Sequence, residues 1–414
     1  MKILLLAQFF PPDVGGEERH AFNLANALAD RGHDVAVATQ LLPHTKPVET
    51  LESGVTVHRF ISSAMKYNRR YLDAARPHHL PIPDPGLTAE LSQLVGRLRP
   101  DVVHAHNWIV NSAVALRRGG RHHPRFGLVL TLHDYSHVCA TKRMMRRGSP
   151  CGGPRPGRCL DCAVSHYGAA VGVVTAAAVP VMRRWKDRSV DHIVSVSTEV
   201  ARRNAVADSR TPSSVIPNFI PDALLADVAG QGRQASTATG NGAGFIFFAG
   251  DLTRDKGALA LRDAYESLAG GRPDLLMVGR RHPDTPDTLP AGARAEAEWP
   301  HDRIIEAFRR CVFAVVPSIC PDACPTTVLE AMACGRAVVA TRTGGIVDLV
   351  QDQVTGLLVP PDDVRALAGA MRRLIDDPGL NRRLGETGRQ RVRDFTASSV
   401  ARRLENIYQG VMDT

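Results

Sequence analysis

The chain has 414 residues, which is too long for one ordinary hydrophobic core and predicts two domains of roughly 200 residues each. Apolar residues make up 44% and charged residues 22% of the sequence, which is the composition of a soluble globular protein. No apolar run approaches the ~20 residues of a membrane-spanning helix, so the sequence argues against an integral membrane protein.

The positive charge of the chain lies in its first half. Residues 1–200 contain 25 Lys and Arg against 16 Asp and Glu, a difference of +9, whereas residues 201–414 contain 26 of each kind. An anionic acceptor, an anionic membrane surface or nucleic acid would suit this excess, and an Arg-rich coding bias without a partner explains it equally well. Aromatic content is 5% and no nucleic-acid motif is present, so we expect no nucleic-acid partner. Peripheral membrane contact through the basic half stays open.

The chain opens with MKILLLAQFFPP, which we interpret as a buried strand over residues 3–7 and not as a secretory signal. The stretch has no basic region longer than Lys2 and no small-residue cleavage site. We therefore expect a cytoplasmic protein, with the inner face of the membrane as the place for any peripheral contact.

A glycine-rich loop follows this first strand. It carries Gly15 and Gly16 and leads into a helix with apolar residues at helical spacing, then into a strand over residues 35–39. Strand, loop, helix and strand in this order open a doubly wound sheet, whose ligands bind at the carboxyl ends of the strands. Two glycines there let the backbone approach a ligand closely.

Histidines follow two of the later strands. We expect these further strands of the first domain over residues 55–60, 101–105, 128–132 and 192–196. His104 and His106 lie at the end of the second of these, and His133 with Asp134 at the end of the third. A single histidine is more often structural than catalytic, but His133 lies on the side of the sheet where a ligand should bind.

Four cysteines fall within 24 residues: Cys139, Cys151, Cys159 and Cys162. The last two form a C-x-x-C pair, and the Gly, Pro and Arg residues between the others cannot build a core. A cytosolic setting argues against disulfides. We expect a tetrahedral structural zinc site, although the first spacings are irregular, with free or redox-sensitive thiols as the alternative.

A second sheet is expected to begin with the strand FIFFAG at residues 245–250. The low-complexity segment 226–244 precedes it, and the loop DLTRDKG follows with Arg254 and Lys256. Arg280–Arg281 lie at the carboxyl end of the next predicted strand and could add positive charge there.

The stretch CPDACPTTVLEAMACGRAVVATRTGG, residues 320–345, combines a loop and a short helix. Pro325 fits the first helical position and Gly335 the position just past the end. The helix N-terminus then offers free backbone N–H groups to an anion. Asp322 and Glu330 lie on either side of this end. They could accept hydrogen bonds from sugar hydroxyls next to a bound phosphate. Alternatively, Asp322 is an ordinary acidic residue at a helix N-terminus and Glu330 a half-buried helix residue.

This stretch resembles the nucleotide-sugar site of retaining glycosyltransferases of family 4, which have the GT-B fold. The family typically has Glu, seven residues and Glu, then Ala-Met-Ala-x-Gly and a Gly-Gly turn. Here Asp322 and Glu330 stand at the two acidic positions, and AMACG and Gly344–Gly345 follow. In the family the first acid contacts the donor sugar and the second contacts the ribose. The loop with Pro-x-x-Gly-Gly, followed by Arg-Gly-His, is typical of the same family.

The resemblance implies roles for individual residues. Lys256 matches the lysine that holds the donor diphosphate, but Asp251 stands where the family has arginine. Arg254 could replace that charge, Asp251 could turn away, or the donor or the activity could be altered. His133, Lys256 and Asp322 are the expected catalytic residues, and Asp13 and His106 the expected acceptor contacts. The expected donor contacts are Gly15, Gly16, Arg254, Lys256, Asp322, Cys324, Pro325, Thr326, Thr327 and Glu330.

The resemblance implies an α/β protein of GT-B type, with two Rossmann-like doubly wound domains facing a cleft. Residues 1–197 would bind the acceptor, residues 198–396 the nucleotide sugar, and a helix over 397–414 would pack back on the first domain. The implied reaction moves a hexose from a UDP- or GDP-sugar to an acceptor hydroxyl of a glycan, a lipid-linked molecule or a small molecule. It retains the anomeric configuration and requires no cofactor. The alternatives are a non-catalytic nucleotide-sugar binder and a GT-B epimerase or phosphorylase.

Overall fold

The chain divides into two α/β units, each built around a mainly parallel sheet. The computed structural model describes residues 1–12, 15–63, 80–119, 124–230, 244–268 and 270–413. The first unit comprises Met1–Arg146, Cys151–Pro217 and Val400–Thr414, and the second comprises Arg147–Pro150 and Asn218–Ser399. The predicted α/β class with two Rossmann-like units is therefore confirmed.

The first unit contains an eight-stranded sheet among the described residues, in the order β10-β9-β6-β5-β1-β2-β4-β3. Every pairing is parallel except that of β3 with β4. The strands are β1 (Lys2–Leu6), β2 (Asp34–Gln40), β3 (Val48–Thr50), β4 (Thr56–Phe60), β5 (Val102–His106), β6 (Gly127–Leu132), β9 (His192–Ser195) and β10 (Ser213–Val215).

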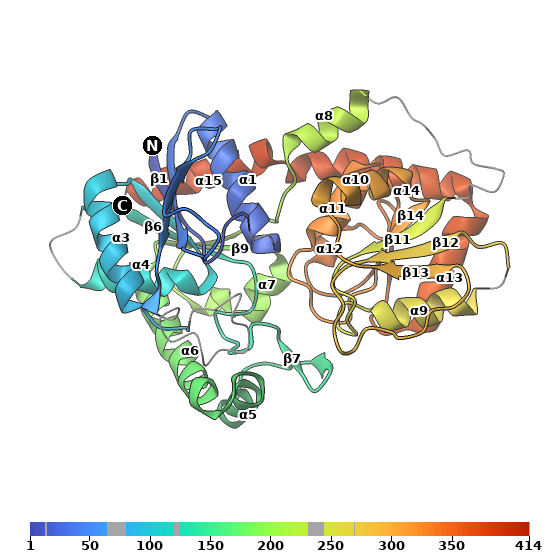
Figure 1. Cartoon of the computed structure of the whole chain (residues 1–414), viewed down its shortest axis with the longest axis horizontal. Helices are drawn as coiled ribbons and strands as arrows, with labels where there is room; N and C mark the ends of the chain where they lie inside the picture. Colours follow the sequence, from blue (N-terminus) through green and yellow to red (C-terminus); the bar gives the residue numbers. More distant parts are fainter. Residues whose placement is uncertain (13–14, 64–79, 120–123, 231–243, 269, 414) are drawn as a thin grey trace. The chain divides into compact units, whose positions relative to one another are not determined.

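Helices cover both faces of this sheet. Helix α1 packs on one face, and α3 and α4 lie together on the other, where α4 also contacts α6 (Figure 1). The helices are α1 (Gly16–Asp30), α3 (Pro85–Leu98), α4 (Val110–Arg118), α5 (Pro156–Tyr167), α6 (Ala169–Ser189) and α7 (Thr198–Arg203). Because helices bury both faces, the central strand β1 can be the continuous apolar run that the sequence contains, with Leu4 and Leu5 fully buried.

The first unit extends to Pro217, whereas the sequence analysis placed a domain boundary after residue 197. The difference arises because β10 pairs in parallel with β9 and lengthens the first sheet. Helix α15 (Ala397–Met412) begins in the second unit, and its residues from Val400 onward belong to the first. In that part the hydroxyl of Tyr408 lies 2.7 Å from His104 Nδ1, and both side chains are fully buried.

The second unit contains a six-stranded parallel sheet among its described residues, in the order β13-β12-β11-β14-β15-β16. The strands are β11 (Phe245–Ala249), β12 (Asp274–Val278), β13 (Ala293–Glu296), β14 (Phe313–Val316), β15 (Val338–Thr341) and β16 (Leu357–Val359). The helices are α8 (Asp222–Gly230), α9 (Ala258–Ser267), α10 (His301–Arg310), α11 (Thr326–Ala333), α12 (Ile346–Leu349), α13 (Val364–Asp376) and α14 (Pro378–Arg391).

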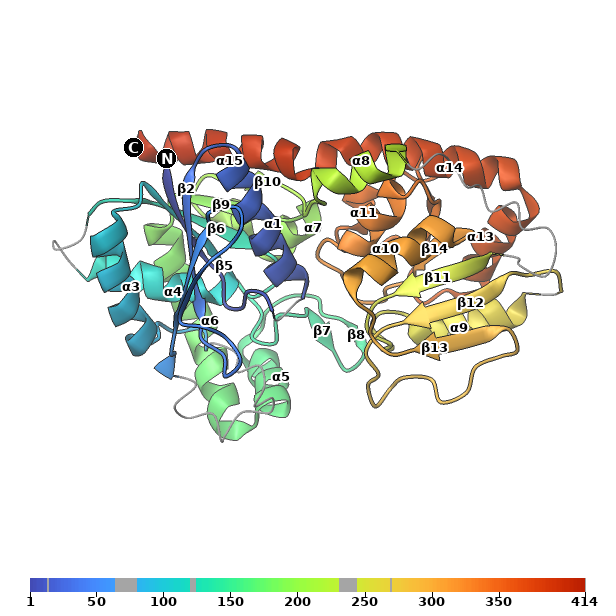
Figure 2. The ribbon, with the colours of Figure 1, turned by 45° about the horizontal axis from the view of Figure 1, so that its top comes forward.

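The core of the second unit joins the sheet to helices α9, α13 and α14. Leu261 of α9 and Met371 of α13 are fully buried in one cluster with residues of β11, β12, β14, β15 and β16. Helix α11 contacts both α10 and α14. Helices α10 and α11 lie on the opposite face of the sheet (Figure 2), whereas Leu380 and Leu384 of α14 belong to that buried cluster. The carboxyl ends of the central strands β11 and β14 are thus left to the loops that carry the predicted site.

No helix in the described part of the chain combines the length and the apolar character needed to cross a membrane. Asp13 and most of the low-complexity segment 226–244 lie outside the described residues. The expectations for these segments therefore stay predictions.

Candidate functional site

The loop between β14 and α11 places Asp322 beside Lys256. Lys256 Nζ donates a hydrogen bond to Asp322 Oδ2 at 2.5 Å, and the hydroxyl of Ser318 lies 3.2 Å from the same oxygen. Burial by itself would lower the pKa of Lys256, but the neighbouring charges, Asp322 first among them, raise it above its usual value. Lys256 is therefore a full cation at neutral pH, which suits the expected contact with a diphosphate.

Two glycines make this arrangement sterically feasible. Gly257 has φ +81°, and a Cβ atom there would lie 2.0 Å from the carbonyl oxygen of Pro317 at the end of β14. Gly344 has φ +56°, and its Cβ would lie 2.0 Å from the carbonyl oxygen of Asp322. The next residue, Gly345, donates its N–H to that oxygen at 2.7 Å. Close backbone packing therefore holds the loop that carries Asp322.

Helix α11 starts directly after this loop. Pro325 is its N-cap, whereas the sequence analysis placed it at the first helical position. Thr326 and Thr327 are the first two helical residues, so their N–H groups lie at the end where an α-helix has no acceptor of its own. The helix dipole adds positive potential at that end. Gly335 follows the helix with φ +68°, as its predicted place just past the end requires.

Cys324, an expected donor contact, is buried and anchors the loop to the start of the second unit. The backbone N–H of Asn218 donates to Cys324 Sγ at 3.3 Å, and its side-chain amide donates to the Cys324 carbonyl oxygen at 2.8 Å. Burial raises the pKa of the Cys324 thiol to about 12, so the thiol stays neutral. These contacts give Cys324 a structural role in the described molecule.

Glu330 pairs with His301, a residue for which the sequence predicted no role. It is buried on α11 and its Oε1 lies 3.0 Å from His301 Nε2, at the start of α10. A half-buried helix glutamate was the alternative reading, but only 3% of the residue is exposed. Buried carboxylates are rare without a partner, and His301 supplies one. No spacing in the sequence links these two residues, which lie on different helices.

Asp251, which stands where the resembled family has arginine, forms an ion pair with Arg280. Arg280 Nε lies 2.9 Å from Asp251 Oδ1, and Arg280 Nη2 lies 3.2 Å from Asp251 Oδ2. This bidentate geometry is possible because β11 and β12 are neighbouring parallel strands and the two residues follow their carboxyl ends. The negative charge of Asp251 is therefore matched by a cation. Arg254 has an exposed side chain, and its backbone N–H donates to Asp284 at 2.7 Å.

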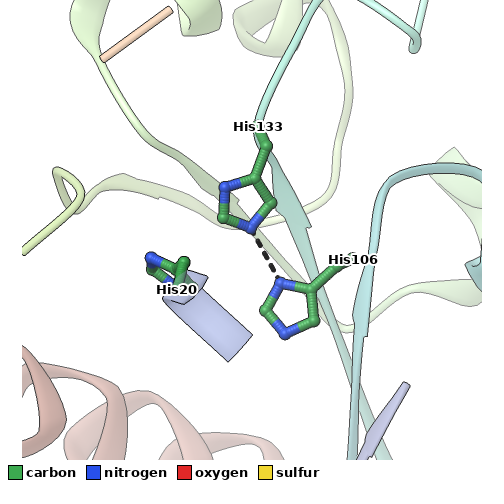
Figure 3. A group of neighbouring side chains, drawn as sticks. All are labelled: His20, His106 and His133. Atoms are coloured by element: carbon green, nitrogen blue, oxygen red, sulfur yellow. Dashed lines mark hydrogen bonds between the residues drawn. The ribbon is translucent and has the colours of Figure 1, made fainter. Parts of the chain in front are cut away.

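In the first unit three histidines meet at the carboxyl ends of β5 and β6 (Figure 3). His106 Nδ1 lies 2.8 Å from His133 Nε2, and the His20 ring packs edge-on against the His133 ring at 4.5 Å between centroids. Burial, followed by the neighbouring histidines, holds the pKa of His106 well below its usual value, so its ring is neutral. One nitrogen of the uncharged His106 ring accepts and the other donates a hydrogen bond, which suits sugar hydroxyls.

His20 was not predicted as a site residue. It lies one turn into α1 and is 5% exposed, so its sequence position alone suggests an ordinary buried helix residue. One ring nitrogen from each of His20, His106 and His133 lies within 4.8 Å of the other two, a spacing at which they could share a metal ion. Gly15 and Gly16 form the start of the same helix, with Gly15 as its N-cap.

Asn107 and Glu17 form the polar surroundings of His133. The Asn107 side chain accepts the backbone N–H of His133 at 2.9 Å and donates to Glu17 Oε2 at 2.7 Å and to Asp134 Oδ2 at 3.3 Å. Burial, with the charges of Glu18 and Asp134, raises the pKa of Glu17 to about 8. The sequence analysis assigned no role to Asn107 or Glu17. Their network fixes the backbone of His133 and keeps a protonated carboxyl group near it at neutral pH.

Two family models match the chain, one in each half. Residues 14–224 match the family described as Glycosyltransferase Family 4, and residues 243–377 match Glycosyl transferases group 1. The chain is a glycosyltransferase, and it belongs to glycosyltransferase family 4. It is 26% identical to a glycogen synthase from Mycobacterium tuberculosis, over 99% of this chain and 94% of that protein. It is 28% identical to a D-inositol 3-phosphate glycosyltransferase from Acidothermus cellulolyticus, over 97% of this chain and 85% of that protein.

Solved structures share the fold at lower identity. A sucrose-phosphate synthase from Thermosynechococcus elongatus superposes with a TM-score of 0.74 at 20% identity, covering 100% of this chain and 99% of that one. Anabaena HepE in complex with UDP-glucose gives a TM-score of 0.67 at 17% identity, covering 99% of this chain and 100% of that one. These neighbours establish the GT-B type of fold for the chain.

Proposed function

We propose that this glycosyltransferase moves a hexose from a nucleoside-diphosphate sugar to an acceptor hydroxyl with retention of the anomeric configuration. The observation that carries the proposal is the ion pair between Lys256 and Asp322 next to the N-terminus of α11. It combines a fixed cation, free helix N–H groups and a carboxylate acceptor, which are the groups that a sugar diphosphate needs. UDP is the favoured nucleotide because Anabaena HepE, which shares the fold, was solved with UDP-glucose.

Each part of this site has a task in binding the donor. Lys256 and the N–H groups of Thr326 and Thr327 hold the diphosphate oxygens. Asp322 accepts hydrogen bonds from hydroxyls of the sugar. Glu330 accepts hydrogen bonds from the ribose, and His301 holds its carboxylate in place at 3.0 Å.

The reaction then breaks the bond between the anomeric carbon and the phosphate oxygen and forms a bond from that carbon to the acceptor oxygen. The acceptor proton passes to a phosphate oxygen of the departing nucleoside diphosphate, on the same face of the sugar. Negative charge grows on the diphosphate as the bond breaks, so the Lys256 cation stabilises the transition state more than the bound donor. The chain's own residues supply this charge, and the proposed reaction needs no cofactor.

The first unit is the proposed acceptor unit. Its His106 and His133 offer hydrogen bonds to hydroxyls, and His133 also serves the donor sugar as the family resemblance implies. The charge of +9 over residues 1–200 favours an anionic acceptor such as a sugar phosphate or a phospholipid-linked sugar. Asp13 stays a predicted acceptor contact outside the described residues. Cytoplasmic placement with contact at an anionic membrane surface is part of the same proposal, and flotation with anionic and neutral vesicles tests it.

The ion pair also weighs against a phosphorylase that holds pyridoxal phosphate on a lysine. A Schiff base forms from a neutral amine, whereas the pairing with Asp322 holds the pKa of Lys256 above its usual value.

Thermal shifts with UDP, GDP and ADP and with their hexose conjugates test the donor class. A ligand that binds only the folded state raises the melting temperature, and the stabilisation grows with the logarithm of one plus the ratio of the free ligand concentration to Kd. One nucleotide that stabilises the protein, followed by NMR of a product with the donor's anomeric configuration, supports the proposal. Absence of any shift, or a product of inverted configuration, contradicts it.

A further inference from the structure

The four clustered cysteines of the first unit surround one cavity. Cys139 lies in the loop after β6, and Cys151 lies in the irregular segment before α5. Cys159 and Cys162 lie on α5. All four line the same cavity, together with Thr141, Met144 and Arg146. We propose that the four thiolates bind one structural zinc ion in this cavity.

The local structure brings the four cysteines to the wall of one cavity. Cys159 and Cys162 are three residues apart on a helix, so both side chains lie on the same face of α5. The segment that carries Cys139 and Cys151 folds back on itself, since Lys142 N–H donates to the Cys139 carbonyl oxygen at 3.1 Å and Cys151 N–H to that of Met144 at 2.6 Å. Three separate chain segments thus bring thiols to one place.

The surroundings suit four thiolates around a dication. The backbone N–H of Arg155 donates to Cys159 Sγ at 3.3 Å, the kind of contact that supports a metal-bound sulfur. Four thiolates and one Zn²⁺ carry a net charge of −2, and the side chains of Arg146 and Arg158 line the same cavity. These cations offset that charge, as outer groups do at metal centres.

Helix α5 packs closely on α6, but few of its apolar side chains are fully buried. Ala163 is the buried residue of α5, and it belongs to a small cluster with Trp108, Ala140 and Val179. Leu160 of the same helix is 41% exposed. The thiols form no disulfide in this structure. A metal cross-link between the three chain segments would add to this packing and stabilise the fold of the segment.

Zinc binding would draw the sulfurs together. Among the described residues, only His20, His106 and His133 bring three potential ligand atoms within 4.8 Å of one another. As a group, the four cysteine sulfurs are therefore spaced more widely than this distance. A tetrahedral site has Zn–S bonds of about 2.3 Å. Cys139 and Cys151 lie outside regular helices, so their segments can close the remaining gap around the fixed pair on α5.

Metal analysis of the full chain, expressed with added zinc and purified without chelator, tests the proposal. We expect about one zinc per chain in the wild type and less than about one tenth in Cys159→Ser. Cys334→Ala removes a buried thiol from the second unit and is the matched control, which should keep its zinc. Folded wild type without zinc, or with iron and sulfide in its place, would overturn the proposal.

A second measurement covers the case in which Cys159→Ser does not fold. Titration of the wild type with a mercurial reagent should release zinc in step with about four thiols, followed with a zinc-sensitive dye. Cys162→His keeps a zinc ligand and should retain the metal. Zinc that stays in Cys159→Ser but disappears in His106→Ala would place the ion in the histidine group and contradict the proposal.

Discussion

Lys256 Nζ lies 2.5 Å from Asp322 Oδ2, although the two residues are 66 positions apart in the chain. One follows β11 and the other follows β14, which are neighbouring parallel strands of the second sheet. The pair gives a cation and a carboxylate at one point at the carboxyl ends of these strands. Ligands of doubly wound sheets bind at that edge.

Replacing Lys256 by alanine should lower kcat by about 100- to 1,000-fold, because the charge that grows on the leaving diphosphate loses its partner. Lys256→Arg keeps a cation and should retain more activity than the alanine variant. Initial rates with saturating donor measure both effects. A near-normal rate in Lys256→Ala would remove the proposed role.

Glu330→Gln and Asp322→Asn should separate nucleotide binding from sugar recognition. Loss of the Glu330 carboxylate should weaken binding of the free nucleoside diphosphate about tenfold, or about 1.4 kcal/mol. Asp322→Asn should bind the nucleoside diphosphate as the wild type does but discriminate less between donor sugars. Calorimetric titration with the nucleotide alone and with two hexose conjugates measures the difference. Equal losses in both variants would contradict these separate roles.

Arg280→Ala should weaken donor binding about tenfold, because Asp251 would then present an unmatched negative charge near the diphosphate. Asp251→Asn in the same chain should restore most of the loss, so the double variant should bind better than Arg280→Ala alone. Arg372→Ala removes an arginine from an exposed ion pair on α13 and is the control. Additive losses in the double-mutant cycle would show that the pair does not act as proposed.

The stability of the first unit should fall as pH rises from about 5 to 8 because of Glu17. Its pKa is about 8 in the folded chain against an ordinary 4.5, so the folded state binds the proton more tightly than the unfolded state over this window. The contribution of Glu17 to the free energy of unfolding is fully present below the pKa of the unfolded chain. It is lost as the pH rises through the pKa of Glu17 in the folded chain. Glu17→Gln should flatten this dependence, measured as melting temperature against pH. Glu90→Gln, at an exposed position of α3, should leave the slope unchanged.

Gly344→Ala should destabilise the second unit by about 2 kcal/mol, because alanine is strained at positive φ and its Cβ would meet the carbonyl oxygen of Asp322. Donor binding should weaken too, since the Asp322 loop must shift. Gly16→Ala is a matched control for stability, because a Cβ there meets no atom within 4 Å. Urea denaturation of both variants measures the effect, and equal stability would contradict the packing argument.

The sequence alone determined the fold class and the family, because these depend on local and regular signals. Continuous apolar runs such as that of β1 indicate parallel strands buried on both faces. The spacing of Asp322, Glu330 and the Gly344–Gly345 turn predicts the site loop from the sequence alone. Gly344 and Gly335 lie at positive φ, so the need for glycine at these positions was already present in the sequence.

Only the tertiary structure decided which charges and rings meet. The sequence does not predict the partner of Asp251, because Arg280 follows a different strand. Their pairing depends on the order of strands in the sheet. His301 reaches Glu330 from another helix, and His20 joins His106 through the packing of α1 on the sheet. The identity of each partner is set by how parallel strands are ordered and how helices pack, and no short-range pattern in the chain encodes that order.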